Sequence, residues 1–147
     1  MNFQRLETRI MNDEGFQARP YLDTAGIATI GYGSTSMLGH YVTMDQAAIA
    51  APVARQLLRS DLYGACVDAQ MLVGRFDELD HVRQEVLVNL AYNLGKGRLS
   101  AFKYLLAALD TLDFDEAAAQ MMDSKWYGQV GGRGARLVAA MRTGQWA

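Results

Sequence analysis

Two acidic side chains, Glu14 and Asp23, stand nine positions apart near the start of the chain. Hydrolysis of a glycosidic bond by the common route needs such a pair, because one carboxyl protonates the leaving oxygen while the other activates water or stabilises the developing cation. Glu14 suits the first role and Asp23 the second, and the hydroxyl of Thr29 could hold a water beside Asp23. The spacing alone is weak evidence, because most acidic residues only solvate a surface.

The elements around these residues are expected to be a helix and a β-hairpin. Apolar residues recur at helical spacing from Phe3 to Ile10, which predicts a helix that ends near Glu14. The helix dipole disfavours a negative charge at that end, which suits a group that must carry a proton. Segments 21–23 and 28–32 carry β-branched and aromatic residues on either side of a turn, which predicts the hairpin.

The remainder of the chain is predicted to be almost entirely helical. Residues 34–41 are expected to form a loop, and the capping-box pattern Thr43-Met44-Asp45-Gln46 predicts a helical stretch that runs to about Leu72. Pro52 should either kink this stretch or open a second helix. Further helices are expected at 79–94, 101–109, 115–122 and 134–142. The predicted fold class is therefore mainly α, with one small antiparallel hairpin (α+β).

Length and composition predict a single domain. The chain has 147 residues, 50% of them apolar, which is enough for one substantial core. We expect a lobe with the hairpin at about 13–58, and a helical lobe at about 73–147 to which an N-terminal helix, residues 2–13, also belongs. No segment is apolar and long enough for a signal peptide or a membrane span, so we expect synthesis in the cytoplasm and no membrane insertion.

Several classes of protein are disfavoured by the residue types. The net charge of −2 argues against a nucleic-acid binder. Cys66 is the single cysteine, which excludes an internal disulfide. His40 and His81 have no partner residues at the spacing of metal ligands, so neither a metal nor another cofactor is expected.

The charges are distributed unevenly near the end of the chain. Residues 110–123 contain five acids and no base, whereas residues 124–147 contain four bases and no acidic side chain. The bases either form a solvated tail or meet an anionic partner, such as the neighbouring acids Asp13 and Glu14.

An ordered series of motifs resembles the phage T4-type lysozymes of glycoside hydrolase family 24. The catalytic signature of that family is similar to Glu14-Gly15, Tyr21-Leu22-Asp23-Thr24, Gly26 and Thr29-Ile30-Gly31-Tyr32-Gly33. The similarity continues through 82–95, 115–118 and 124–129, then Arg133, Arg136 and 142–146. Roughly three quarters of the chain is covered.

The resemblance implies a muramidase that cuts the β-1,4 bond between N-acetylmuramic acid and N-acetylglucosamine in peptidoglycan, with inversion. The role of proton donor falls on Glu14, and the positioning of water on Asp23 and Thr29. Arg133 is implied to pair with Glu14, and Arg136 with Asp13. Tyr32, Asn93 and Gln129 resemble groove positions that hydrogen-bond acetamido groups, whereas Trp126 and Trp146 resemble tryptophans of the core.

The sequence departs from the family pattern at two places. Family members often have histidine after the Gly-x-Gly that ends the hairpin, where this chain has Ser34, so any ion pair made by that histidine is absent. Pro52 lies in what resembles an insertion of about two helical turns. The chain is also mildly acidic, whereas better-known members are basic.

The expected context is a monomeric phage or prophage endolysin, or a lytic module of a virion, that acts on peptidoglycan glycan strands. It would reach the wall in the periplasm through a holin or by delivery from the virion. Two alternatives are a lytic transglycosylase or chitosanase on the same fold, and a non-catalytic wall-binding or structural virion protein. Intact Glu14, Asp23 and Thr29 argue against the second alternative.

Overall fold

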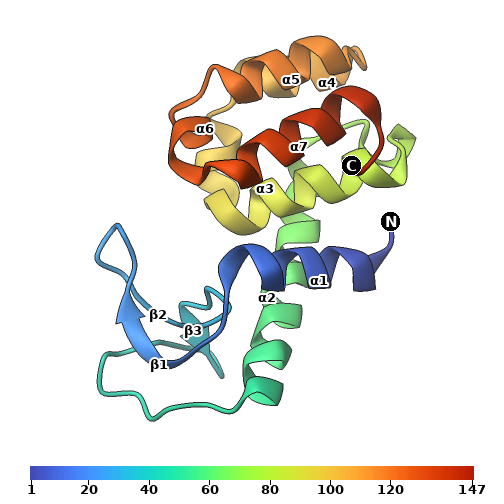
Figure 1. Ribbon diagram of the computed structural model, residues 1–147. Coiled ribbons are helices and arrows are strands. Elements are labelled where there is room, and N and C mark those ends of the chain that lie inside the picture. Colours follow the sequence, from blue (N-terminus) through green and yellow to red (C-terminus); the bar gives the residue numbers. More distant parts are fainter. The chain divides into compact units, whose positions relative to one another are not determined.

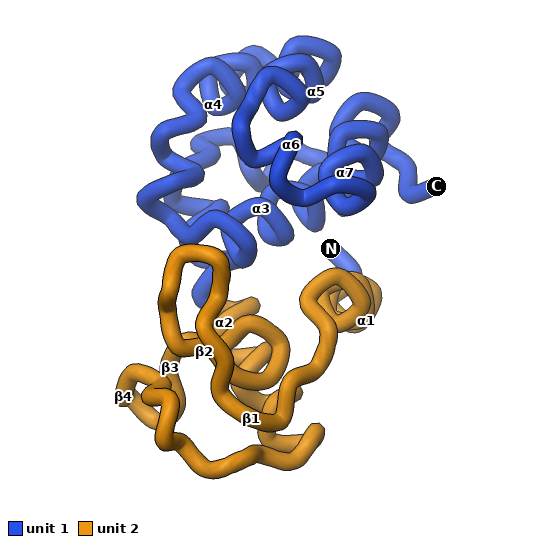
Figure 2. The backbone as a smooth tube through the Cα atoms, turned by 60° about the vertical axis from the view of Figure 1, so that its left-hand side comes forward, with its two compact units in different colours: residues 1–2, 64–147 blue, residues 3–63 orange.

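The computed structural model describes residues 1–147 and divides into two compact units (Figure 2). Unit 2 comprises Phe3–Tyr63, and unit 1 comprises Met1–Asn2 with Gly64–Ala147. Seven α-helices and two small antiparallel sheets make up the chain, which confirms the predicted mainly helical α+β class. The first helix groups with the hairpin in unit 2 and not with the helical lobe to which it was predicted to belong.

Unit 2 contains the predicted N-terminal helix and hairpin (Figure 1). Its elements are α1 (Phe3–Glu14), β1 (Gln17–Leu22), β2 (Ala28–Gly31), β3 (Ser36–Met37), β4 (His40–Tyr41) and the first half of α2 (Ala51–Leu72). Strands β1 and β2 pair antiparallel, with Tyr21 opposite Thr29. The register is irregular between Gln17 and Tyr21, where Pro20 has no N–H for the ladder. The hairpin prediction is confirmed.

A buried glutamate holds α1 against α2 within unit 2. Glu7 is 3% exposed and accepts hydrogen bonds from the Nε atoms of Arg55 and Arg59. Burial opposes ionisation, but these two arginines hold the pKa of Glu7 below its usual value. The rings of Phe3 and Tyr63 stack with centroids 4.8 Å apart, which adds an apolar contact between the same helices.

Two predictions about the segment after the hairpin are wrong. The expected loop at 34–41 contains a second sheet, in which β3 pairs with β4. The expected helix does not begin at the capping-box pattern, because the Thr43 hydroxyl bonds Asp45 and the Ile49 N–H donates to the Ala18 carbonyl at 2.9 Å. The segment is therefore bonded to β1 at Ile49, and α2 begins only at Ala51, with Pro52 in its first turn, where an N–H is not needed.

Unit 1 is helical. After the end of α2 it contains a 3₁₀ turn (Phe76–Glu78), α3 (His81–Ser100), α4 (Lys103–Asp110), α5 (Phe114–Met122), α6 (Lys125–Val130) and α7 (Gly132–Thr143). Side chains of Asp80, Asp113 and Ser124 cap α3, α5 and α6 by accepting from backbone N–H groups. The short helix α6 is an element that the sequence did not predict.

The middle of α3 is the core of unit 1. Val86, Leu87, Val88 and Leu90 are each 0% exposed, and α7 packs against both α3 and α5. A helix that is buried on nearly all sides has no single apolar stripe, so the spacing of apolar residues does not show clearly where such a helix begins and ends. The helix continues to Ser100, but Gly95 kinks its path with a φ of 78°.

Two side chains of α3 fix the C-terminal segment within unit 1. Glu85 is 0% exposed and accepts from the Asn2 N–H at 2.8 Å and from Trp146 Nε1 at 2.9 Å. Arg83 donates to the carbonyls of Met141 and Arg142, which satisfies the end of α7. None of the helices has the length and apolar character needed to cross a bilayer.

Candidate active site

Glu14 is the last residue of α1, as predicted. Gly15 follows with a φ of +71°, and its N–H donates to the Met11 carbonyl at 3.0 Å, which ends the helix. The Glu14 carboxyl lies against the turn after β2, because a Cβ atom at Gly33 would come within 3.2 Å of Glu14 Oε2. Gly33 also has a φ of +87°, so this turn requires glycine both for its backbone and for the close approach of the carboxyl.

Tyr21 lies in the field of both predicted catalytic acids. Burial raises the pKa of the Tyr21 hydroxyl, and the charges of Glu14 and Asp23 raise it further. Both carboxyls therefore act on the same phenol of strand β1 within unit 2. The action of Glu14 and Asp23 as a catalytic pair stays a prediction.

Asp23 begins the turn of the hairpin and is only partly exposed. Its Oδ1 accepts from the N–H groups of Ala25 and Ile27, each at 2.9 Å. Its own N–H donates to the Ile27 carbonyl at 3.0 Å. Both turn contacts of the carboxylate use Oδ1, so Oδ2 is the oxygen that can accept a hydrogen bond from a water.

Thr29 is more buried than a water-binding residue on a surface would be. It is 3% exposed, and its Oγ1 donates to the Ile27 carbonyl at 2.9 Å. Because that bond uses the hydroxyl proton, Thr29 can only accept from a water. A water between Asp23 and Thr29 would direct one proton to each, which leaves an oxygen lone pair for attack.

Tyr32 packs in the interior of unit 2. It is 8% exposed, and its ring lies 5.6 Å from the ring of Phe16. This environment gives Tyr32 a packing role, and its predicted contact with substrate stays a prediction.

Ser34 occupies the place where the family pattern has histidine. It is 0% exposed and donates to Asp61 Oδ2 at 2.6 Å, so a neutral hydrogen-bond donor replaces the expected cation. Burial raises the pKa of Asp61, and the bond from Ser34 opposes that shift only in part. The turn after β2 is therefore still tied to α2, but without an ion pair.

The other predicted residues lie in unit 1, on α3, α6 and α7. Asn93 accepts at Oδ1 from Trp126 Nε1 at 2.8 Å, and Trp126 is 2% exposed, which confirms its place in the core. Gln129 is exposed on α6, and Arg136 is exposed on α7. The predicted pairs of Arg133 with Glu14 and of Arg136 with Asp13 join residues of different units and stay predictions.

Arg133 has a partner that the sequence did not predict. Its Nε and Nη2 donate to Asn89 Oδ1 at 3.0 and 2.9 Å, and the two residues are 8% and 1% exposed. Asn89 Nδ2 is buried without a hydrogen-bond partner. The signal available in the sequence was the spacing of Asn89 and Asn93, which places two amides one turn apart on the same face of α3.

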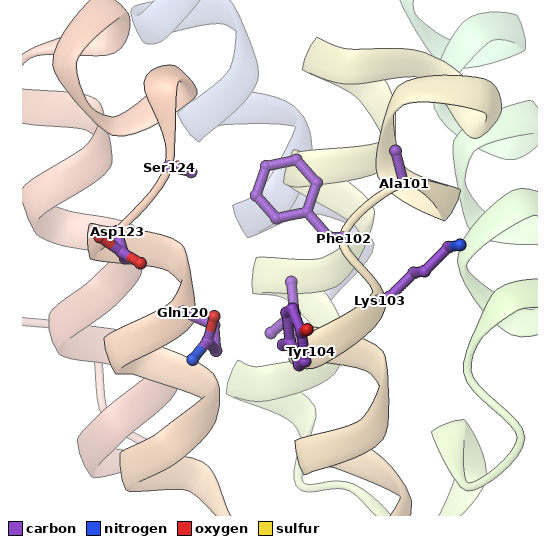
Figure 3. A pocket seen from close by; sticks show the side chains of 8 residues that line it. Ala101, Phe102, Lys103, Tyr104, Gln120, Asp123 and Ser124 are labelled. Carbon is purple, nitrogen blue, oxygen red and sulfur yellow. The ribbon is translucent and has the colours of Figure 1, made fainter.

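A separate pocket of about 300 Å³ lies in unit 1 between the start of α4 and the end of α5 (Figure 3). Figure 3 shows Tyr104 and Gln120 facing one another across it, while Lys103 points away. Its lining mixes apolar and polar side chains: Ala101, Phe102, Lys103, Tyr104, Leu105, Gln120, Asp123 and Ser124. None of the predicted site residues lines it.

Comparisons with known proteins cover most of the chain. The model of the family described as "Phage lysozyme" matches residues 11–142. "Probable T4-type lysozyme 1" of Dictyostelium discoideum is 27% identical, with 90% of each chain covered. "Probable T4-type lysozyme 2" of the same organism is 24% identical over 95% of this chain and 94% of its own. The "Pre-baseplate central spike protein Gp5" of Enterobacteria phage T4 is 28% identical, and the alignment spans 92% of this chain but 27% of that protein.

Proposed function

Because the chain belongs to the phage lysozyme family, we propose that this lysozyme-like peptidoglycan hydrolase is an inverting N-acetylmuramidase. It hydrolyses the β-1,4 bond between N-acetylmuramic acid and N-acetylglucosamine. The observation that carries the proposal is the placement of Glu14 and Asp23 around Tyr21, one at a helix end and one on a hairpin turn.

Glu14 is the general acid. It is the last residue of α1, and its carboxyl lies against the turn at Gly33. A neutral carboxyl protonates the glycosidic oxygen as the bond to the anomeric carbon breaks, and it becomes a carboxylate in that step.

Asp23 is the base that activates water. Its Oδ1 is held by two backbone N–H groups, so the carboxylate keeps a fixed orientation with Oδ2 turned to the water. Thr29 accepts a hydrogen bond from the other O–H of that water, which stays on the oxygen, because the Thr29 hydroxyl already donates to the Ile27 carbonyl. The oxygen then attacks the anomeric carbon on the face opposite to the leaving group, which inverts the configuration.

The biological setting that we propose is lysis of a bacterial wall in the service of a phage or prophage. The chain would act as a free endolysin or as part of a virion. The similarity to a spike protein of a phage supports the second possibility beside the first. It works on glycan strands as a monomer, and it reaches them through a holin or by delivery from the virion.

Analysis of reaction products tests the chemistry. Purified peptidoglycan digested by the wild-type protein should yield muropeptides with reducing N-acetylmuramic acid ends, as measured by mass spectrometry before and after borohydride reduction. Proton NMR at the first minutes of reaction should show the α-anomer as the initial product. Muropeptides with 1,6-anhydro ends would instead identify a lytic transglycosylase, and β-anomers would exclude inversion.

A further inference from the structure

Tyr21 shares one face of the hairpin with the two residues that hold the proposed water. It pairs with Thr29 across the strands, and opposite residues of an antiparallel pair have Cβ atoms about 4.5–5.5 Å apart on the same face. The pairing continues through Asp23, whose N–H donates to the Ile27 carbonyl, and side chains two positions apart on a strand point to the same face. Building on the proposed function, we infer that Tyr21 is a third catalytic residue of the hairpin, whose hydroxyl donates a hydrogen bond to the attacking water.

The burial of these side chains fits a sheltered face that water can still reach. Thr29 is 3% exposed, whereas Tyr21 and Asp23 are half-buried. Leu22, which lies between those two in the sequence, is 57% exposed and points to the opposite face. The hairpin therefore turns the three polar side chains toward the protein and leaves two of them in partial contact with solvent.

Tyr21 is also within electrostatic reach of both proposed catalytic acids. Burial raises the pKa of the Tyr21 hydroxyl most, and the charges of Glu14 on α1 and then of Asp23 raise it further. No hydrogen bond within the protein contributes to this shift. The phenol therefore keeps its proton at neutral pH, and that proton is available to a molecule that binds beside the acids.

The attacking water needs a donor as well as two acceptors. Asp23 Oδ2 is an acceptor, and Thr29 Oγ1 can only accept because its proton is bound to the Ile27 carbonyl. Both therefore take hydrogen bonds from the water and leave two lone pairs on its oxygen. A donor to one lone pair fixes the direction of the other, which must point at the anomeric carbon. The Tyr21 hydroxyl is the neutral donor on this face.

Tyr21 would hold the water without exchanging a proton in the reaction. The water oxygen bonds to the anomeric carbon as one of its protons passes to Asp23, and its other O–H becomes the new hydroxyl of the sugar. The leaving oxygen takes the proton of Glu14, so one acid becomes neutral as the other becomes charged. Because the phenol bonds the water and not the glycan, loss of its hydroxyl should lower kcat and leave KM unchanged.

Titration of Tyr21 tests its placement without reference to activity. In ¹³C spectra of protein with labelled tyrosine, the Tyr21 signal is identified by its absence in Tyr21→Phe. The pKa of Tyr21 should fall in Asp23→Asn and fall further in Glu14→Gln, because each change removes a negative charge that acts on the phenol. Asp45→Asn removes an exposed charge of unit 2 that does not act on Tyr21, so it should leave this pKa unchanged.

Kinetics on purified peptidoglycan tests the catalytic role. Tyr21→Phe keeps the ring and removes the donor, so kcat should fall by about 3- to 10-fold at unchanged KM. Thr29→Val removes an acceptor of the same water, so the double variant should lose less than the product of the two single losses. Tyr41→Phe changes a tyrosine of β4 that is 87% exposed, and it should keep the kcat of wild type.

Four results would overturn the inference. An unchanged pKa of Tyr21 in both Asp23→Asn and Glu14→Gln would place the phenol away from the acids. A kcat of Tyr21→Phe within about twofold of wild type would show that the water does not use this donor. Losses that simply multiply in the double variant would show that Tyr21 and Thr29 do not hold one water. A displaced pH–activity profile with an unchanged kcat at its optimum would mean that the hydroxyl acts on a carboxyl and not on the water.

The proposed function can fail separately from this inference. Each of the four results leaves the proposed function standing, because each is compatible with an active wild-type protein. A wild-type protein without activity on any peptidoglycan would instead refute the proposed function, and the catalytic role of Tyr21 with it. The titration would still decide whether the phenol lies beside both acids.

Discussion

Replacement of Asp23 by asparagine separates its part in catalysis from its part in the hairpin. Asparagine retains Oδ1, so it can still accept from the N–H groups of Ala25 and Ile27, and the turn should remain intact. Asparagine has a neutral amide in place of the carboxylate, so it cannot take a proton from water. Removal of a general base lowers rates by about 10²–10⁴-fold, so kcat of Asp23→Asn should fall by that factor.

Asp23→Ala provides the contrast, because it removes the base and both turn contacts together. Each hydrogen bond contributes about 0.5–1.5 kcal/mol net. Both lie at a partly exposed turn, so the free energy of unfolding should fall by about 1–2 kcal/mol in Asp23→Ala and by less than about 0.5 kcal/mol in Asp23→Asn.

Two assays decide the matter together. Urea denaturation followed by circular dichroism gives the stabilities, and release of reducing ends from purified peptidoglycan gives kcat and KM. A kcat of Asp23→Asn within tenfold of wild type would refute the role of Asp23 as the base, and wild-type stability of Asp23→Ala would refute its role in the turn. A change confined to KM would place Asp23 in substrate binding instead.

Further predictions concern the turn after β2, the half-buried Asp61 and the buried Glu85. Gly33→Ala should lower both activity and stability, the latter by about 1–2 kcal/mol, because the backbone is at a φ of +87° and the new Cβ meets the Glu14 carboxyl. Burial raises the pKa of Asp61 above its ordinary value of 3.8, so the folded state holds the proton to higher pH than the unfolded chain. The free energy of unfolding, measured by urea denaturation, should therefore fall as pH rises from 3.8 through the folded-state pKa. Asp61→Asn should remove this dependence on pH over the same range. Glu85→Ala leaves the Trp146 indole and the Asn2 N–H without their acceptor, so the free energy of unfolding from thermal melting should fall by about 2–5 kcal/mol. A fall of less than about 0.5 kcal/mol would contradict a stabilising role for these two hydrogen bonds.

The local parts of the site could be predicted from the sequence. Glycine after an amphipathic segment marks the end of α1, and β-branched residues around a turn mark the hairpin. These signals depend on neighbours in the chain, so the positions of Glu14 and Asp23 follow from them. The resemblance to a lysozyme signature then supplied roles that spacing alone could not.

The long-range parts could not be predicted. The start of α2 is set by a hydrogen bond from Ile49 to Ala18, which overrides the helix propensity of an alanine-rich segment. The short helix α6 is stabilised by burial of Trp126 more than by its own sequence, which contains glycine at position 128. The bond between Asn89 and Arg133 joins residues 44 positions apart. No local pattern specifies such a contact.

The measurement that tests the central claim most directly is lysis by Glu14→Gln beside wild type. Glutamine has nearly the same shape but cannot donate a carboxyl proton to the leaving oxygen. Turbidity of a suspension of purified peptidoglycan should fall with wild type and with the control Glu78→Gln, an exposed acid of the 3₁₀ turn in unit 1. With folded Glu14→Gln, turbidity should remain constant within the error of the assay. Clearance by Glu14→Gln at a rate near that of wild type would contradict the account.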